Sequence, residues 1–173
     1  MIRIGQGYDV HAFAGEETGG VAGAVTSHVT LGGVRIPHSR PLVAHSDGDV
    51  LVHALCDALL GAAAMGDIGR LFPDTDSRYQ GISSLLLLAN VMTKLESAGW
   101  MLVNADMTVI AQMPKIASHA QSIANRLADT IACRPDQLSI KATTSEGLGA
   151  MGRGEGIAVQ AVVLIRSGDD KEF

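Results

Sequence analysis

The chain has 173 residues, of which 47% are hydrophobic and 18% are charged. This length suits one compact domain with a sizeable core and is short for two. The net charge of −5 and the aromatic content of 3% argue against a basic or base-stacking surface, so no nucleic-acid partner is expected.

The cysteines and the apolar runs indicate the compartment. Cys56 and Cys133 lie far apart without CxxC spacing, so they predict neither a thiolate metal site nor a disulfide framework. The first residues lack the basic and apolar regions of a secretory signal, and no run reaches the ~18 apolar residues of a membrane span. We therefore expect a cytoplasmic protein without a membrane partner.

The predicted elements alternate between strands and helices. Residues 1–12 and 29–37 have strand patterns, and the small and glycine-rich residues between them predict a flexible surface loop at about 14–30. Apolar residues at helical spacing predict a helix that begins after an Asp49 N-cap and stops at Gly66. Further helices are predicted over 83–98 and 115–131, and further strands over 104–113, 138–144 and 156–167.

This alternation predicts an α/β fold in which one domain, residues 1–173, packs helices on a β-sheet. No repeat, low-complexity tract or linker divides the chain. The pattern leaves two-layer and three-layer arrangements open. The long apolar last strand favours burial on both of its faces.

Asp9, His11 and His53 are candidate metal ligands. Residues two apart on a strand point to the same face, so Asp9 and His11 lie together. A first helix packed on this strand brings His53 to them, and the three form a zinc site with an open fourth position, typical of catalytic zinc. The alternative is structural, because the chain has six histidines. In that case Asp9 is a turn residue and His53 a partly buried helix residue.

Two polar stretches flank the predicted helix. Asp47 and Asp49 suit ordinary loop and capping roles, whereas His45 beside a helix N-terminus suits a phosphate or a negatively charged transition state. The loop at 66–77 carries three aspartates that could accept from ribose hydroxyls or bind a divalent ion. The alternative for this loop is a surface turn.

Two later segments are also candidates for ligand binding. Pro114 is expected at a helix start with Lys115 in the first turn, where a cation serves an anionic ligand better than the helix; otherwise Lys115 is solvated. In the segment 141–157, closely spaced glycines let the backbone approach a ligand, with Arg153 as the cation among them. The order of residues matches neither a P-loop nor GxGxxG. The alternative is a tight bend between two buried strands.

Five segments taken together resemble a known family. GQGYDVHAF, AHSDGDVLVHALCDALLGAA, GDIGRLFPDTD, ADMTVIAQMPK and KATTSEGLGAMGRGEGIA are similar, in order and spacing, to the 2-C-methyl-D-erythritol 2,4-cyclodiphosphate synthase family of the non-mevalonate isoprenoid pathway. The resemblance spans nearly the whole chain, apart from the 14–30 loop and the last few residues. It implies a homotrimer around a threefold axis with active sites between adjacent subunits.

The resemblance also implies a lyase reaction. The family converts 4-diphosphocytidyl-2-C-methyl-D-erythritol 2-phosphate to 2-C-methyl-D-erythritol 2,4-cyclodiphosphate and releases CMP, as the 2-phosphate of the substrate attacks its own β-phosphate. Such a transfer requires positioning and charge neutralisation more than a protein nucleophile.

Residue roles follow from the same resemblance. Asp9, His11 and His53 hold one Zn²⁺ per subunit, Glu146 holds a second divalent ion, Mg²⁺ or Mn²⁺, and His45 and Thr144 stabilise the transition state. Substrate contacts around the metal and the methylerythritol end are implied for Asp9, Val10, His11, His45, Ser46, Asp67, Ile68, Gly69, Phe72, Pro73, Asp74, Thr75 and Asp76. Contacts with cytidine diphosphate are implied for Ala111, Gln112, Met113, Pro114, Lys115, Ile116, Ala117, Thr143, Thr144, Ser145 and Glu146.

Two departures from the family pattern concern the threefold cavity. Ala150 stands where the family commonly has Phe, and Gly147 replaces a larger residue, which predicts a wider or differently lined cavity. Arg153 matches the cation at the mouth of this cavity, where the resemblance implies binding of an isoprenoid diphosphate.

Two other classes of protein remain open from the residues. In a zinc-dependent phosphoesterase the same ligands would activate water. A non-catalytic trimeric nucleotide-binding module would keep the segment 111–117 but has little use for three metal ligands.

Overall fold

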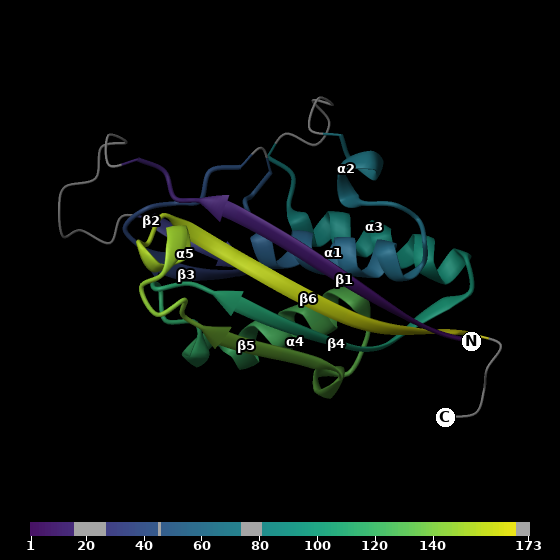
Figure 1. Ribbon diagram of the computed structural model, residues 1–173. Helices are drawn as coiled ribbons and strands as arrows, with labels where there is room; N and C mark the ends of the chain where they lie inside the picture. Colours follow the sequence, from purple (N-terminus) through teal and green to yellow (C-terminus); the bar gives the residue numbers. More distant parts are fainter. Residues whose placement is uncertain (16–26, 45, 74–80, 169–173) are drawn as a thin grey trace.

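A computed structural model describes residues 1–15, 27–44, 46–73 and 81–168 of the protein. The ribbon in Figure 1 follows the elements in chain order. They are β1 (Ile2–Ala12), β2 (Ser27–Leu31), β3 (Val34–His38), α1 (Val50–Ala62), α2 (Ile68–Leu71), α3 (Ser84–Ser97), β4 (Trp100–Ile110), η2 (Ala117–His119), α4 (Ala120–Ile131), η3 (Pro135–Gln137), β5 (Leu138–Thr143), α5 (Gly149–Gly152) and β6 (Gly156–Ser167).

One mixed sheet organises the described part of the chain. Its strand order is β1-β6-β4-β5, and β6 runs antiparallel to both of its neighbours. Because β4 and β5 are parallel, strands β1, β4 and β5 all end at the same edge of the sheet, where their arrowheads point in Figure 1. Side chains that follow these strands therefore gather at this carboxyl edge.

Helices cover one face of this sheet, so the fold has two layers (Figure 1). Helix α1 packs against β1 at Gly5 and Gly7. A Cβ atom at Gly5 would lie 2.0 Å from the Ala58 carbonyl oxygen, and one at Gly7 would lie 2.0 Å from that of Ala54. Only glycine permits this close approach, which brings the side chains of α1 next to the end of β1.

The opposite face of the sheet is open in the described chain. Its side chains on β1 and β6 include exposed apolar residues, among them Ile4 (71% exposed), Tyr8 (51%) and Val162 (43%). The expectation that the last strand is buried on both faces is therefore wrong for the single chain. Residues Gly156–Val159 of β6 are all buried, but from Gln160 onward buried and more exposed side chains alternate, because only the helix-facing ones enter the core.

Asp49 confirms the predicted start of the first helix. Its carboxylate accepts from the backbone N–H of Val52 at 3.1 Å and from those of Gly32 and Gly33 at 2.9 and 2.7 Å. It thus caps α1 and ties the β2–β3 hairpin to it, which confirms the structural interpretation of this residue. Burial raises its pKa to about 6, against the effect of the three N–H donors.

Several predicted boundaries are corrected. The segment 29–37 is a hairpin rather than one strand, because Gly32 and Gly33 turn the chain with φ of 57° and 73°. Helix α1 ends at Ala62 instead of Gly66, and the helix predicted over 115–131 begins only at η2 and α4. Of the predicted 14–30 loop, residues 16–26 lie outside the described residues and Ser27–Leu31 is a strand. The other predicted elements are confirmed within a few residues at each end.

Within the described ranges, no helix combines the length and apolar character needed to cross a membrane.

Candidate metal site and adjoining pockets

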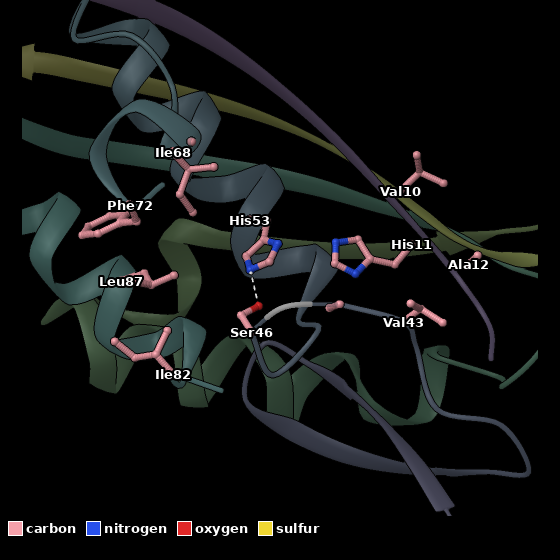
Figure 2. A pocket seen from close by; sticks show the side chains of 12 residues that line it. Val10, His11, Ala12, Val43, Ser46, His53, Ile68, Phe72, Ile82 and Leu87 are labelled. Carbon is pink, nitrogen blue, oxygen red and sulfur yellow. Dashed lines mark hydrogen bonds between the residues drawn. The ribbon is translucent and has the colours of Figure 1, made fainter. Parts of the chain in front are cut away.

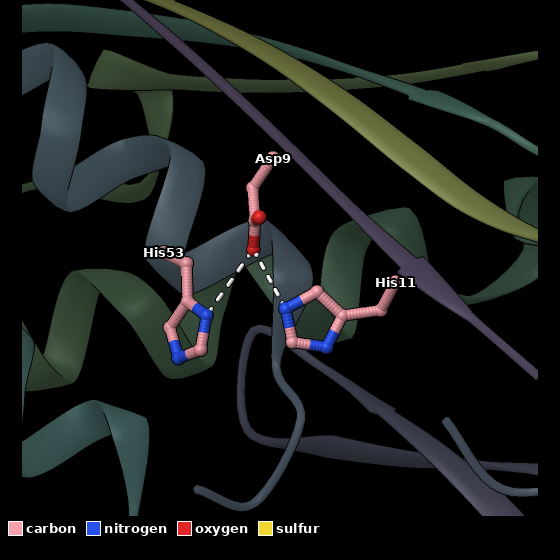
Figure 3. Close-up of side chains that lie close together, drawn as sticks. All are labelled: Asp9, His11 and His53. Atoms are coloured by element: carbon pink, nitrogen blue, oxygen red, sulfur yellow. Dashed lines mark hydrogen bonds and ion pairs between the residues drawn. The ribbon is translucent and has the colours of Figure 1, made fainter. Parts of the chain in front are cut away.

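The end of β1 and the first turn of α1 bring together the three predicted metal ligands (Figure 3). Oδ2 of Asp9 lies 3.0 Å from Nε2 of His11 and 3.2 Å from Nδ1 of His53. One ligand atom from each residue falls within 4.8 Å of the others, and all three residues are half-buried. The predicted convergence of a strand pair with a helix residue is confirmed.

The electrostatics of this group favour a cation. Burial alone would raise the pKa of Asp9, but hydrogen bonds and charge from His11 and His53 outweigh it and hold that pKa well below the usual range. Burial disfavours the charged form of His53, yet Asp9 raises the pKa of His53 overall. The Asp9 carboxylate therefore stays negative at neutral pH and favours a positive charge beside it.

The donor set fits a metal ion. Two imidazole nitrogens and one carboxylate oxygen at mutual hydrogen-bond distance are the ligands that zinc accepts in sites with an open coordination position. His53 is further held on its outer nitrogen, where Nε2 lies 3.0 Å from Oγ of Ser84 and 3.1 Å from Oγ of Ser46. Such outer contacts are typical of metal-ligating histidines.

A pocket of about 430 Å³ adjoins the metal ligands (Figure 2). His11, His53 and Ser46 supply polar groups to its lining, and Ile68, Gly69 and Phe72 line it as well. The predicted ligand contacts Val10, Ser46, Ile68, Gly69 and Phe72 all line this pocket. Val43, Ala44, Ile82 and Leu87 also line it and are not predicted, because apolar residues in loops and helices carry no sequence signal for a ligand.

Helix α2 holds one wall of this pocket in place. Asp67 caps it by accepting from the backbone N–H of Arg70 at 2.8 Å. Asp57, one turn beyond His53 on α1, accepts from the backbone N–H of Ile68 at 2.8 Å. Asp67 is thus a helix cap in the chain alone, and Asp57 links the helix that carries His53 to the pocket wall.

A second pocket, of about 180 Å³, lies after β4 and β5. Ala111, Pro114, Lys115, Ile116 and Ala117 line it together with Ala142, Thr143 and Thr144. The two segments predicted to bind cytidine diphosphate therefore meet. Gln112, Met113, Ser145 and Glu146 lie next to the lining residues in sequence but outside this set.

Two details of this second region differ from expectation. Lys115 precedes the first helical residue, Ala117, so the prediction that it lies in the first turn of a helix is wrong. Thr144 donates through Oγ1 to Oε1 of Glu146 at 2.7 Å, and Glu146 has a φ of 52°. A non-glycine residue in this left-handed region is uncommon and is often found at functional sites.

The remaining predicted residues are divided between described and undescribed parts. Ala150 lies in α5, and Arg153 forms an exposed ion pair with Glu155 at 2.6 Å. Pro73 directly follows Phe72 at the rim of the 430 Å³ pocket. The predictions for His45, Asp74, Thr75 and Asp76 fall outside the described residues.

The two pockets share the carboxyl edge of the sheet but lie on different strands. The larger pocket belongs to β1 and α1, the smaller to β4 and β5, and β6 runs between β1 and β4. Among the described residues, no residue lines both. A ligand that needs both must bridge the edge of the sheet or lie between two copies of the chain.

These features define an α/β protein with a candidate metal centre and pockets of small-molecule size at one sheet edge. A family model described as the YgbB family matches residues 2–166. The chain therefore belongs to the YgbB family.

Proteins similar to this chain share one name. The 2-C-methyl-D-erythritol 2,4-cyclodiphosphate synthase of Thioalkalivibrio sulfidiphilus is 55% identical over 166 residues, which cover 96% of this chain and 98% of that protein. The protein of the same name from Methylococcus capsulatus is 52% identical over 165 residues, covering 95% and 98%.

Solved structures agree with this similarity. The bifunctional IspDF of Campylobacter jejuni matches with a TM-score of 0.86 and 40% identity, over 96% of this chain and 42% of that chain. The IspF–CDP complex of Plasmodium falciparum matches with a TM-score of 0.79 and 33% identity, over 96% of both chains.

Proposed function

We propose that this protein catalyses the reaction for which its relatives are named, the formation of 2-C-methyl-D-erythritol 2,4-cyclodiphosphate. The substrate is 4-diphosphocytidyl-2-C-methyl-D-erythritol 2-phosphate, the other product is CMP, and the reaction belongs to the non-mevalonate route to isoprenoid precursors. One observation carries the proposal: a chain similar to these synthases over nearly its full length brings Asp9, His11 and His53 together beside a pocket.

The proposed metal is zinc, held by Asp9, His11 and His53. When bound, zinc supplies a Lewis acid that polarises a phosphate oxygen. The residues around it position the substrate, because the attacking oxygen belongs to the substrate itself. Ser46, Ile68 and Phe72 enclose the methylerythritol end, and their mostly apolar wall excludes water that would otherwise compete as the nucleophile.

The second pocket is proposed to bind the cytidine diphosphate end. Its lining by the turn at 111–117 offers backbone groups that can pair with the edge of a base, and Lys115 adds positive charge for the diphosphate. The similar IspF of Plasmodium falciparum forms a complex with CDP, which supports a cytidine nucleotide as the ligand. Glu146, held by Thr144, is proposed as the ligand of a second ion, Mg²⁺ or Mn²⁺, and Thr144 with His45 as the donors that stabilise the transition state.

A homotrimer with active sites between adjacent subunits is proposed for two physical reasons. The open face of the sheet carries exposed apolar side chains on β1 and β6, which a monomer would leave in water. The two pockets of one chain are separated by β6, so a neighbouring copy can supply the second half of each site. An isoprenoid diphosphate near Arg153, in the threefold cavity beside Ala150, stays a prediction.

The direct test is product identity. The purified protein is incubated with the cytidylyl substrate and Zn²⁺ plus Mg²⁺, and the products are separated by anion exchange and phosphorus NMR. CMP with a cyclic diphosphate is the expected result. CMP with the open-chain 2,4-bisphosphate would identify a phosphoesterase instead, and CDP binding without turnover would identify a nucleotide-binding module.

A further inference from the structure

Ser84, the first residue of α3, is a buried polar residue that the proposed mechanism does not use. In the described part of the chain, Ser84 and Asp49 are the two buried polar or charged residues, and each is 0% exposed. The Ser84 hydroxyl donates to Oδ1 of Asp47, and its backbone N–H donates to Oδ2 of the same residue at 2.9 Å. Asp47 therefore holds both donors of Ser84 and fixes the direction of the hydroxyl proton.

The direction of this hydroxyl proton determines which ring nitrogen of His53 is protonated. Oγ of Ser84 lies 3.0 Å from Nε2 of His53. A hydroxyl has one proton, and that of Ser84 points to Asp47, so the oxygen can only accept from the ring. Nε2 therefore carries the proton. Nδ1, 3.2 Å from Oδ2 of Asp9, is then the ring nitrogen left to bind a cation shared with that carboxylate.

The other histidine of the metal group lacks such support. Nε2 of His11 faces Asp9 at 3.0 Å, and its Nδ1 is buried without a hydrogen-bond partner among the residues that the structure describes. The two histidines thus face the Asp9 carboxylate with different ring nitrogens, Nε2 of His11 and Nδ1 of His53. Of the two rings, His53 is the one whose outer nitrogen leads through a hydroxyl to a second carboxylate.

We infer that Asp47 and Ser84 form a relay that holds His53 in the Nε2–H tautomer and presents Nδ1 to the metal. The inference rests on the proposed metal site. Neither residue contacts the ligand atoms of Asp9 or His11, so both are positioning residues that act through the imidazole. The Asp47 charge, transmitted through the hydroxyl, also makes Nδ1 a stronger donor. Outer-shell partners of this kind typically change metal affinity by about 10- to 100-fold.

The relay connects distant parts of the chain. Asp47 precedes α1, Ser84 begins α3 and His53 lies on α1, so docking α3 against α1 completes the metal site. Oγ of Ser46 also lies 3.1 Å from Nε2 of His53, but it accepts from the Gly48 N–H at 3.3 Å and has no carboxylate behind it among the described residues. The two serines on one ring nitrogen therefore have different roles.

The test measures the Zn²⁺ dissociation constant of the full-length protein by competition with a chromophoric chelator. Ser84→Ala and Asp47→Asn are each expected to weaken binding by about 10- to 100-fold. The double variant is expected to be no weaker than the weaker single variant, because both changes break one chain of hydrogen bonds. Ser83→Ala is the matched control, since the Ser83 side chain makes no capping hydrogen bond. It is expected to bind as the unmodified protein does.

Nitrogen-15 NMR of the histidine rings provides a readout that a purely structural role would not change. In the zinc-loaded protein, the Nε2–H proton of His53 is expected to be protected from exchange with water, and to exchange faster in Ser84→Ala. Unchanged zinc affinity in Ser84→Ala and Asp47→Asn, additive losses in the double variant, or equal exchange of the Nε2–H proton in Ser84→Ala and the unmodified protein would each overturn the relay. If Ser84→Ala does not fold, the zinc affinity and Nε2–H exchange of Asp47→Asn test the relay in the same way.

Failure of the proposed metal site is separately visible. His53→Ala is expected to remove specific zinc binding altogether. If the unmodified protein binds no zinc, the proposed metal site is wrong; if it binds zinc and both Asp47→Asn and Ser84→Ala bind it equally well, the metal site stands and only the relay is wrong.

Discussion

The metal group and the β4–β5 pocket lie at the same sheet edge but are built differently. The ligands of the metal group stand on β1 and α1, two regular elements pressed together at Gly5 and Gly7. The β4–β5 pocket is formed by the segments that follow two strands, where Thr144 and Glu146 hold each other through a hydrogen bond. The first region is organised by the fold before any ligand arrives. The second depends on local hydrogen bonds between residues that follow the strands.

Removal of a proposed metal-ligating side chain, in the region organised by β1 and α1, is expected to have the largest effect. His53→Ala should eliminate zinc and nearly all turnover, because it removes one of the three proposed metal ligands. The proposed homotrimer should survive, since the exposed apolar face of the sheet is untouched. Elemental analysis and size-exclusion chromatography measure both. Full zinc occupancy in the variant would show that the metal is held elsewhere.

A single methyl group added between β1 and α1 should also disrupt the contact that positions the proposed metal ligands. Gly7→Ala places a Cβ atom 2.0 Å from the Ala54 carbonyl oxygen, so strand and helix must separate. We expect a loss of about 3 kcal/mol in the free energy of unfolding, the upper end of the usual cost of overpacking, and weaker zinc binding.

The matched control for this change is Gly61→Ala on the same helix. Its Cβ would approach nothing nearer than the Gln6 carbonyl oxygen at 3.9 Å, so the variant should gain about 0.5–1 kcal/mol from reduced backbone entropy. Chemical denaturation compares the two variants. Equal stability of Gly7→Ala and the unmodified protein would show that the contact between β1 and α1 does not position His53.

In the β4–β5 region we expect a change in rate more than in stability. Thr144→Val should lower kcat by about a hundredfold with a much smaller change in KM, the usual loss for one preorganised donor to a transition state. His45→Ala is predicted to lower kcat in the same way, also with a much smaller change in KM. Steady-state kinetics of the zinc-loaded protein separate the two constants. A large rise in KM at constant kcat would make Thr144 a substrate-binding residue only.

Base selectivity should be the mildest effect in this comparison. If backbone groups of 111–117 pair with the cytosine edge, CDP binds tightly and UDP or ADP weakly, because unmatched buried polar groups are costly. Calorimetry with the three nucleotides measures the difference. Equal affinities would contradict a base-specific pocket.

The residues of the metal group on β1 and α1 are also the ones that the sequence predicts best. Asp9 and His11 are two apart on a strand, and Asp49 and His53 are one turn apart on a helix, so short-range periodicity is enough to place them. Asp49 as a cap follows from its residue type alone. The Gly32–Gly33 turn escapes prediction because apolar residues continue on both sides of it, although two glycines between strands are a hairpin signal.

The features that the sequence does not predict arise from long-range contacts or from elements too short for a periodic pattern. Ser84 has no local pattern that marks it as a partner of His53, because its role arises from the packing of α3 near α1 and from Asp47, 37 residues earlier. Helix α2 has four residues and is too short for a periodic signal. The sequence of β6 predicts burial on both faces, because its apolar side chains point both to the core and to the exposed face.

The oxygen source of the product tests the proposed cyclisation most directly. The unmodified protein is supplied with its substrate in water enriched with oxygen-18, and both products are analysed by mass spectrometry. An intramolecular transfer forms the new P–O bond from substrate oxygen, so neither CMP nor the cyclic diphosphate should contain the label. Label on a phosphate of the initial products would show that water attacks, and would contradict the cyclase.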